Sequence, residues 1–435
     1  MLFESMRRRC LRDFGGSYPD PIKTDIMNPD ELVTYTTTLQ SVTSQKYADI
    51  DISAQCFVAP SSDEEGLQIA NRYTRPFADA LAAQKNLEHF SLHVVHASIL
   101  PEGHDQQDHD QQQPLSALTE PTVLAPFAVL FKFKNLETLT LVGLRSVLEN
   151  PTSSISLPNL KRLFLAGVSV NSETSADILT NIIKNGQLKS LAVVNAYQTN
   201  GRLASVIADC AKAKDLKHLQ MLNLSHNNMC RESMNKVLKG VLSFCSNIDQ
   251  LILKGNTGPD KSAIPRTPSS TLTVLEMSNA NFEFVEHLIK AASVAGSLPI
   301  LRSIVVHNVT PEGPMVQGSF DRFSAALGEK SRLETLILFS ESSFWLLAEY
   351  ALDFNPSKMG PQELFWNDAV PWIQTLGEGL KQNSTSGSLT KFYLAGVSDF
   401  ERFHPYNPIA IRIPELSPRI IDLAPTTEEL TLMLA

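Results

Sequence analysis

Apolar residues recur along this chain in the order L-x-x-L-x-L, with Leu, Ile, Val, Phe or Met sharing the three apolar positions. The clearest copy runs from Leu219 to Asn227. Eight closely spaced copies have their first apolar position at Leu136, Leu160, Leu188, Leu219, Ile248, Leu272, Leu301 and Leu333. These positions lie 24, 28, 31, 29, 24, 29 and 32 residues apart, which indicates a chain built from repeats of one supersecondary unit.

Further copies lie outside this closely spaced series. Two start at Leu87 and Leu389, a weak one begins at Tyr47, and a partial one starts at Leu430. We therefore expect the repeat to extend over about residues 46–435.

The spacing within one copy predicts a strand, and the spacing between copies predicts helices. The second and third apolar positions are two residues apart, so they share one face of a short strand while the residue between them lies on the other face. Apolar residues at intervals of three and four follow over 176–183, 203–210 and 234–242, which is typical of helices. Helices are wider than strands, so a stack of such units is expected to curve with the sheet on its concave side.

This pattern resembles the leucine-rich-repeat family, and its spacing of about 28 to 29 residues is similar to that of the ribonuclease-inhibitor-like class. The resemblance implies an α/β fold, a curved solenoid or horseshoe with a parallel sheet on the concave face and helices on the convex face. Asn227 and Asn256 occupy the position of the family's asparagine ladder. Other copies place apolar residues there, so we expect an incomplete ladder: Leu144, Val168, Ala196, Ala280 and Val309.

The chain divides into a cap and a repeat region. Residues 1–45 are predicted to form an N-terminal cap, with a helix that starts near Asn28 and Pro29. Residues 46–435 form the solenoid, interrupted by a polar loop at 101–126 and an insertion at 342–388. The loop contains candidate metal ligands at His104, Asp105, Asp108, His109 and Asp110, but nothing in the pattern fixes their geometry. We predict no metal site and no cofactor.

The insertion holds all three tryptophans, Trp345, Trp366 and Trp372. One interpretation is that they form the small core of the insertion. The other is that Trp345 and Trp366 are exposed anchors for a partner, because Trp is enriched at binding hot spots.

The residue between the second and third apolar positions, and the one after the third, are predicted to face the concave side. They are Thr140, Val142, Phe164, Ala166, Ala192, Val194, Asn223, Ser225, Ile252, Lys254, Glu276, Ser278, Val305, His307, Ile337, Phe339, Tyr393 and Ala395. The middle of this series is polar and its C-terminal part is apolar. We therefore predict a partner-binding face at Glu276, Val305, His307, Ile337, Phe339 and Tyr393, unless the 342–388 insertion folds back over it.

The composition of the chain disfavours some classes of partner and some locations. The chain has 37 Lys and Arg against 46 Asp and Glu, a net charge of -9, which disfavours nucleic acid as a partner. No apolar run is long enough to span a membrane. The five cysteines form no C-x-x-C pair, which favours a reducing compartment and cysteines that act as small core residues. We expect a cytoplasmic monomer, with the nucleus or secretion into a host cell as alternative locations.

The sequence offers no catalytic motif. It lacks a glycine-rich phosphate loop, H-E-x-x-H and G-x-S-x-G. Glu276 and His307 are expected on adjacent strands, but no nucleophile accompanies them. The chain is thus predicted to be a non-catalytic scaffold that binds another protein on its concave face, as an adaptor, sensor or effector. The alternative is a regulator of small-GTPase hydrolysis, because one branch of the resembling class does this; that branch carries an acidic tail, which is missing here.

Overall fold

The computed structural model describes two compact units, residues 1–206 and 207–435. The described residues are 23–26, 28–42, 45–53, 56, 64, 68–95, 124–149, 155–198, 201–265, 271–309, 317–329, 331–340, 391–396 and 429–432. Most of the predicted polar loop at 101–126, the 342–388 insertion and all three tryptophans lie outside these ranges. Residues 124–126 of the predicted loop belong instead to a helical segment, whose 3-10 helix η4 spans Ala125–Lys132.

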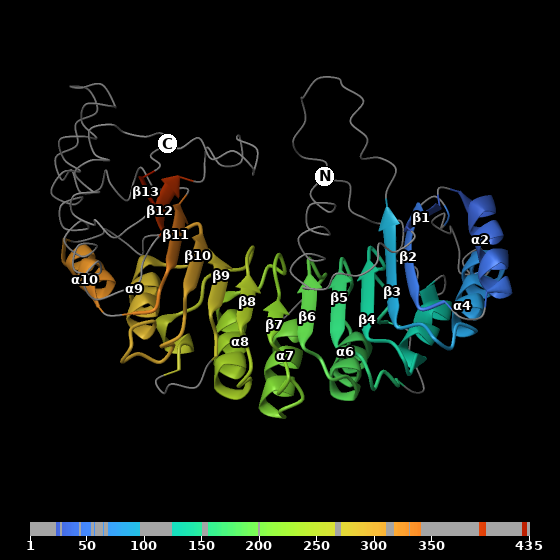
Figure 1. Cartoon of the computed structure of the whole chain (residues 1–435), viewed down its shortest axis with the longest axis horizontal. Helices are drawn as coiled ribbons and strands as arrows, with labels where there is room; N and C mark the ends of the chain where they lie inside the picture. The colour runs from blue at the N-terminus through green and yellow to red at the C-terminus, as the bar shows by residue number, and fades with distance from the viewer. Residues whose placement is uncertain are drawn as a thin grey trace, which may run out of the picture. The chain divides into compact units, whose positions relative to one another are not determined.

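Both units are built from parallel strands that follow one another in chain order (Figure 1). The first unit contains β1 (Lys23–Ile26), β2 (Tyr47–Ser53), β3 (His89–Val95), β4 (Thr138–Val142), β5 (Arg162–Ala166) and β6 (Ser190–Val194). The second contains β7 (Met221–Asn223), β8 (Gln250–Leu253), β9 (Val274–Ser278), β10 (Ser303–His307), β11 (Thr335–Ser340), β12 (Lys391–Gly396) and β13 (Glu429–Leu432). The α/β repeat architecture with a parallel sheet is thereby confirmed.

The sequence repeat sets the positions of the strands. In each of the eight closely spaced copies, the strand begins two residues after the first apolar position, from Thr138 after Leu136 to Thr335 after Leu333. The three apolar side chains of each of these copies are at most 2% exposed. β1 was not expected, because it lies inside the predicted cap, yet it pairs in register with β2.

Helices or short helical segments connect the strands, and those of each unit lie together on one side of its strands (Figure 1). They are α2 (Pro29–Ser41), the π-helix η2 (Ala70–Thr74), α4 (Arg75–Ala82), η4, α6 (Glu173–Asn185), α7 (Arg202–Lys212), α8 (Arg231–Phe244), the 3-10 helix η5 (Lys261–Ala263), α9 (Phe282–Ala291) and α10 (Gln317–Gly328). The helices predicted over 176–183, 203–210 and 234–242 are confirmed as α6, α7 and α8. No helix among the described residues is long and apolar enough to cross a membrane.

Buried polar contacts hold the N-terminal helix α2 on the first unit. Asn28 caps α2 as predicted, because its side chain accepts the amide of Glu31 at 3.0 Å. Gln84, which follows α4 and is 1% exposed, donates from Nε2 to the carbonyl of Leu39 at 2.8 Å and also contacts the carbonyl of Val42. Gln84 thereby ties the C-terminal end of α2 to the segment after α4, and its bond to Leu39 adds to the one that the amide of Val42 donates to the same carbonyl.

At the start of eight strands, β3 to β6 and β8 to β11, two successive amides share one carbonyl of the preceding repeat. The carbonyl of Glu137 accepts two amides of the next repeat, those of Lys161 at 2.9 Å and Arg162 at 3.0 Å. The same pattern recurs at the equivalent residues Lys46, Glu88, Lys161, Gln220, Asp249, Thr273 and Arg302. The strands therefore start at a fixed position in each repeat because a backbone hydrogen-bond pair sets their register.

A second recurring feature turns the chain away from the sheet. The eighth residue of seven copies has a positive φ: Gly143, Gly167, Asn195, His226, Gly255, Asn279 and Asn308. Glycine and asparagine tolerate this conformation best, so their recurrence has a backbone cause. At Gly255 a Cβ would also lie 2.4 Å from Nδ1 of His226, so the ring of His226 requires a glycine there.

The cysteines were expected to be buried in the core, and three of the four described cysteines are buried. Cys56, Cys210 and Cys245 are buried, and burial raises the pKa of Cys56 to about 11 and that of Cys245 to about 12. Cys230 is exposed. It lies at the start of α8, where the chain leaves the core, so the prediction of a core cysteine was wrong at this position.

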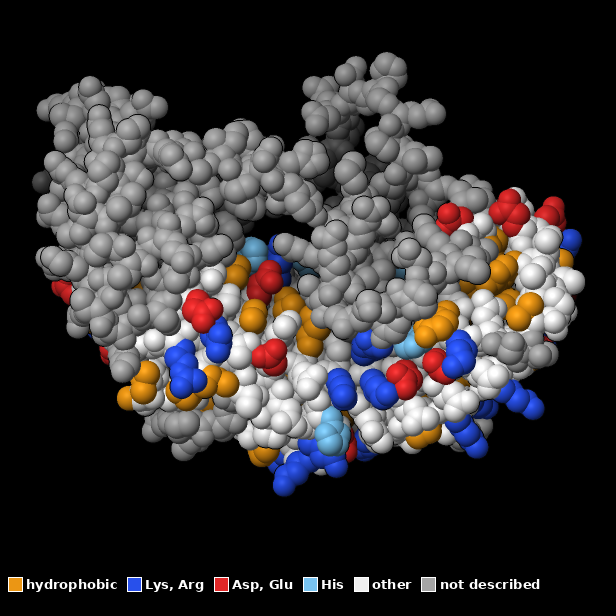
Figure 2. Space-filling view, viewed as in Figure 1, with side chains coloured by type: hydrophobic (Ala, Val, Ile, Leu, Met, Phe, Trp, Pro, Cys, Tyr) orange, Lys and Arg blue, Asp and Glu red, His pale blue; other side chains and the backbone are white. Residues whose placement is uncertain are grey.

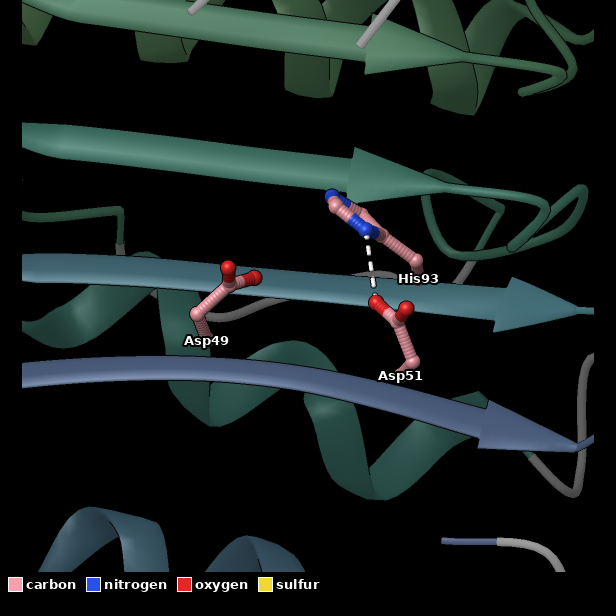
Figure 3. A group of neighbouring side chains, drawn as sticks. All are labelled: Asp49, Asp51 and His93. Atoms are coloured by element: carbon pink, nitrogen blue, oxygen red, sulfur yellow. Dashed lines mark hydrogen bonds and ion pairs between the residues drawn. The ribbon is translucent and has the colours of Figure 1, made fainter. Parts of the chain in front are cut away.

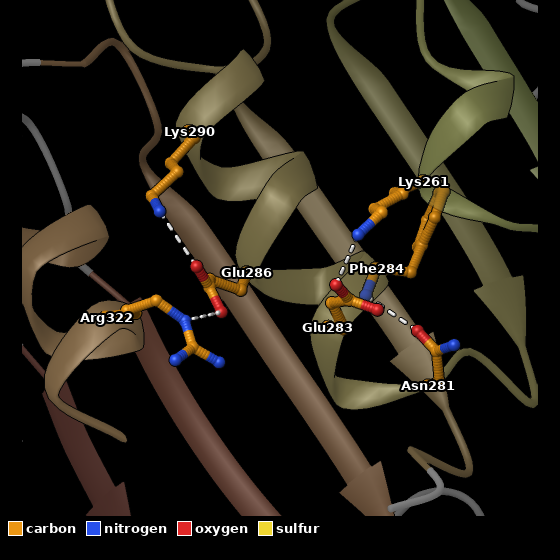
Figure 4. Close-up of polar contacts among 7 residues, drawn as sticks. All are labelled: Lys261, Asn281, Glu283, Phe284, Glu286, Lys290 and Arg322. Atoms are coloured by element: carbon orange, nitrogen blue, oxygen red, sulfur yellow. Dashed lines mark hydrogen bonds and ion pairs between the residues drawn. The ribbon is translucent and has the colours of Figure 1, made fainter. Parts of the chain in front are cut away.

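A buried carboxylate connects the two last described helices (Figure 4). Glu286 of α9 is 6% exposed and lies between Lys290, one turn along at 2.8 Å, and Arg322 of α10 at 3.2 Å. Nearby, Asn281 caps α9 by accepting the amide of Phe284 at 2.6 Å, and Glu283 pairs with Lys261. A carboxylate this deeply buried is tolerated because two cations compensate it.

The expected incomplete asparagine ladder is present at both predicted positions. Asn256, which is 1% exposed, donates to the carbonyls of Leu224 at 2.8 Å and Leu253 at 2.9 Å. Its Oδ1 accepts the amides of Asn227 at 3.2 Å and Met229 at 3.1 Å. One side chain thus satisfies four backbone groups of two successive repeats.

We predict that Asn256→Ala lowers the free energy of unfolding by about 2 to 3 kcal/mol, because it leaves buried backbone groups without partners. Guanidinium denaturation followed by circular dichroism measures the change. The matched control is Asn247→Ala, which removes one exposed bond to the carbonyl of Lys217 and should cost less than about 1 kcal/mol. Equal losses in the two variants would contradict the structural role of Asn256.

Candidate functional site: the inner face of the second unit

One row of residues runs in register across the second unit, on the sheet face opposite the apolar positions of the repeat. Neighbours in this row are Cα partners in adjacent parallel strands: Asn223, Ile252, Glu276, Val305, Ile337, Tyr393 and Thr431. Ser278 and His307 are partners in a second row, two residues further along the strands. We call this surface the inner face of the second unit.

The predicted residues of the middle strands are partly exposed on this face. Glu276 and His307 form a pair, with His307 Nε2 2.8 Å from Glu276 Oε1 and side chains 24% and 25% exposed. Val305 and Ile252 are half-buried apolar neighbours in the first row. A hydrogen-bonded Glu–His pair thus lies next to apolar side chains that are accessible to solvent.

His226 and Lys254 extend the polar part of the face. His226 lies at the turn after β7, and its amide donates to the carbonyl of Lys254 at 2.6 Å. Partial burial lowers the pKa of His226, and the charges of Lys254 and His307 lower it further, against the opposing effect of Glu276. The site therefore combines one cation, one carboxylate and two imidazoles.

The structure describes three of the eight predicted site residues completely and three others only in their backbone. Glu276, Val305 and His307 lie together on the inner face. The backbones of Ile337 and Tyr393 continue the same row, and Phe339 lies two residues beyond Ile337 in β11. The side chains of these three residues, and all of Trp345 and Trp366, lie outside what the structure describes.

The inner face of the first unit contains an apolar cluster that the sequence analysis did not single out. Phe164, Ala166, Ala192 and Val194 are 1 to 8% exposed and pack together, with Val142 partly buried beside them. The alternation of side chains along the strands predicts that all five residues lie on the inner face. From the sequence, however, only the apolar C-terminal part of the inner-face series was chosen as a candidate binding surface. Because these side chains are nearly inaccessible, the cluster is not an open docking surface in this structure.

A polar cluster on β2 and β3 was also missed, and Figure 3 shows its three members. His93 Nδ1 lies 2.9 Å from Asp51 Oδ1, and Ser91 Oγ lies 2.8 Å from His93 Nε2. Asp49 precedes Asp51 by two residues on the same strand face. The sequence around Tyr47 could have predicted this cluster. Ile50 and Ile52 of the weak copy face the core, so residues 49 and 51 between them lie on the opposite, inner face.

The lowered pKa of His226 predicts how stability depends on pH. Above the ordinary value of 6.5 the imidazole is neutral in both states; as the pH falls below it, the unfolded chain takes up a proton first, so stability decreases. Asn tolerates the positive φ at this position, so His226→Asn should lose less stability than the wild type between about pH 8 and about pH 5.5. Denaturation midpoints at both pH values measure the difference, and equal losses would contradict it.

Comparison with known proteins adds no assignment to this geometry. No family model matches the chain, and no curated protein sequence matches it. The function proposed below is therefore supported by the repeat, the register of the strands and the chemistry of the inner face alone.

Proposed function

We propose that this chain is a non-catalytic scaffold of the leucine-rich-repeat type, similar to the ribonuclease-inhibitor-like class, that binds another protein on the concave face of a curved solenoid. The observation that carries the proposal is the registered row from Asn223 to Thr431, in which Glu276 and Val305 are adjacent. Seven parallel strands each contribute one residue to this row, and a row of this length suits a polypeptide rather than a small molecule.

The chemistry of this face supports a protein ligand. Half-buried Ile252 and Val305 offer apolar contact, and the Glu276–His307 pair offers directional polar contact beside them. Protein interfaces combine such an apolar centre with polar groups that fix orientation. The same strands hold these side chains on a rigid frame, so little conformational entropy is lost on binding.

The charge distribution favours protein over nucleic acid. The chain is acidic overall, with a net charge of -9. On the side of the molecule that Figure 2 shows, both acidic and basic side chains occur on the described surface. Phosphate recognition requires clustered Lys and Arg, so a chain with an acidic balance gives it little support.

The test is affinity purification of the full chain followed by mass spectrometry, with Val305→Asp as the disrupting variant. A carboxylate among apolar contacts should reduce recovery of the specific partner at least about tenfold, as for a central hot spot. Phe339→Ala and Tyr393→Ala extend the test along the same face.

The matched control is Val294→Asp, which makes the same chemical change at a 53% exposed position after α9. Its partner recovery should equal that of the wild type. A partner that Val305→Asp retains in full, while both variants remain folded, would place the binding surface elsewhere.

A further inference from the structure

We propose that Asp49, Asp51 and His93, on the inner face of the first unit, form a binding site for a divalent transition-metal ion of the zinc type. One ligand atom from each of the three side chains lies within 4.8 Å of the other two. The proposal is independent of the protein-binding function proposed for the second unit.

The backbone brings these residues together and fixes their directions. In the parallel register of β2 and β3, Asp51 lies opposite His93 and Asp49 lies opposite Ser91. Alternation along each strand then directs all four side chains to the same face. The site therefore rests on two regular strands, which position ligands more rigidly than a loop does.

The donor set suits zinc. Zinc prefers imidazole nitrogen and carboxylate oxygen at about 2.0 to 2.2 Å, which puts neighbouring ligand atoms about 3.3 Å apart in a tetrahedral site. The 2.9 Å separation of His93 Nδ1 and Asp51 Oδ1 is close to that value. Asp49, whose ligand atom lies within 4.8 Å of the other two, would be the third protein ligand, and a water molecule would take the fourth position.

Burial gives a physical reason for a cation here. Asp49 and His93 are each 7% exposed, and the side chain of Asp51 is 14% exposed. Two carboxylates held this close together in a poorly solvated place repel each other. A divalent cation bound between them would neutralise both carboxylates.

Ser91 supplies the outer contact that metal-bound imidazoles usually have. Its Oγ lies 2.8 Å from His93 Nε2, the ring nitrogen that faces away from Asp51. With the metal on Nδ1, the Nε2–H group donates to Ser91, which fixes the tautomer and the ring plane. The same contact explains why His93 presents Nδ1 rather than Nε2 to the two carboxylates.

The chain of Asp51, His93 and Ser91 also has the order of an acyl-transfer triad, but the cation interpretation fits the surroundings better. β3 pairs with β2 on one side and with β4 on the other. Its backbone N–H groups are used in these ladders, so the strand offers no oxyanion site beside Ser91. A strand face with two carboxylates is equally unsuited to a developing negative charge.

The experiment is calorimetric titration of the chelator-treated full chain with Zn²⁺. We expect one equivalent to bind, with affinity reduced at least about tenfold in each of Asp49→Asn, Asp51→Asn and His93→Gln. These near-isosteric changes keep the strand packing, and far-UV circular dichroism confirms that each variant is folded. Asp177→Asn and His218→Gln make the same changes at exposed positions and should bind as the wild type does.

A second measurement stays informative if a variant fails to fold. Co²⁺ added to the wild-type chain should give visible absorption of a four-coordinate site with nitrogen and oxygen ligands, and Zn²⁺ should abolish it. Absence of this absorption would overturn the proposal, as would zinc affinity that all three ligand variants retain. The second result would assign the bound ion to adventitious surface groups.

Discussion

Within each unit, the fold depends on the parallel pairing of each strand with the next. A strand of three to seven residues cannot bury its apolar side chains alone. In both units the side chains at the three apolar positions are at most 2% exposed in each of the closely spaced copies. These side chains are buried because neighbouring repeats supply matching strands. The stability of the fold therefore comes from the contacts between repeats and not from any single repeat.

Pairing alone would leave the register free to slip, and polar groups of the backbone prevent this. The carbonyl just before eight of the strands, such as that of Glu137 before β4, accepts two amides of the following repeat. At the other end of the strand a positive φ turns the chain away, and in one place Asn256 binds four backbone groups. Strand length is thereby bounded at both ends, which is why the observed strands keep the spacing of the sequence repeat.

How much the sequence could predict follows from this physics. The apolar positions predicted all eight closely spaced strands, because side chains that are buried on one face of a sheet are apolar and recur at every second residue. β1 escaped prediction since Lys23–Ile26 is too short and polar to show the pattern, although pairing with β2 is enough to form it. Cys230 was wrongly predicted to be buried. Whether it is buried depends on where α8 begins, and the spacing of apolar residues locates the start of a helix only to within a turn.

The inner faces were harder to predict for a different reason. Alternation tells which residues face inward, but what they form depends on which residues the register places next to one another. Glu276 and His307 were expected near each other because their copies are successive and both fit the repeat well. Asp51 and His93 are 42 residues apart, across a long connection with a weak copy at one end, so only the observed pairing of β2 with β3 brings them together. Burial in the core constrains the residue types on one face of each strand but not those on the inner face, and both proposed binding sites lie on inner faces.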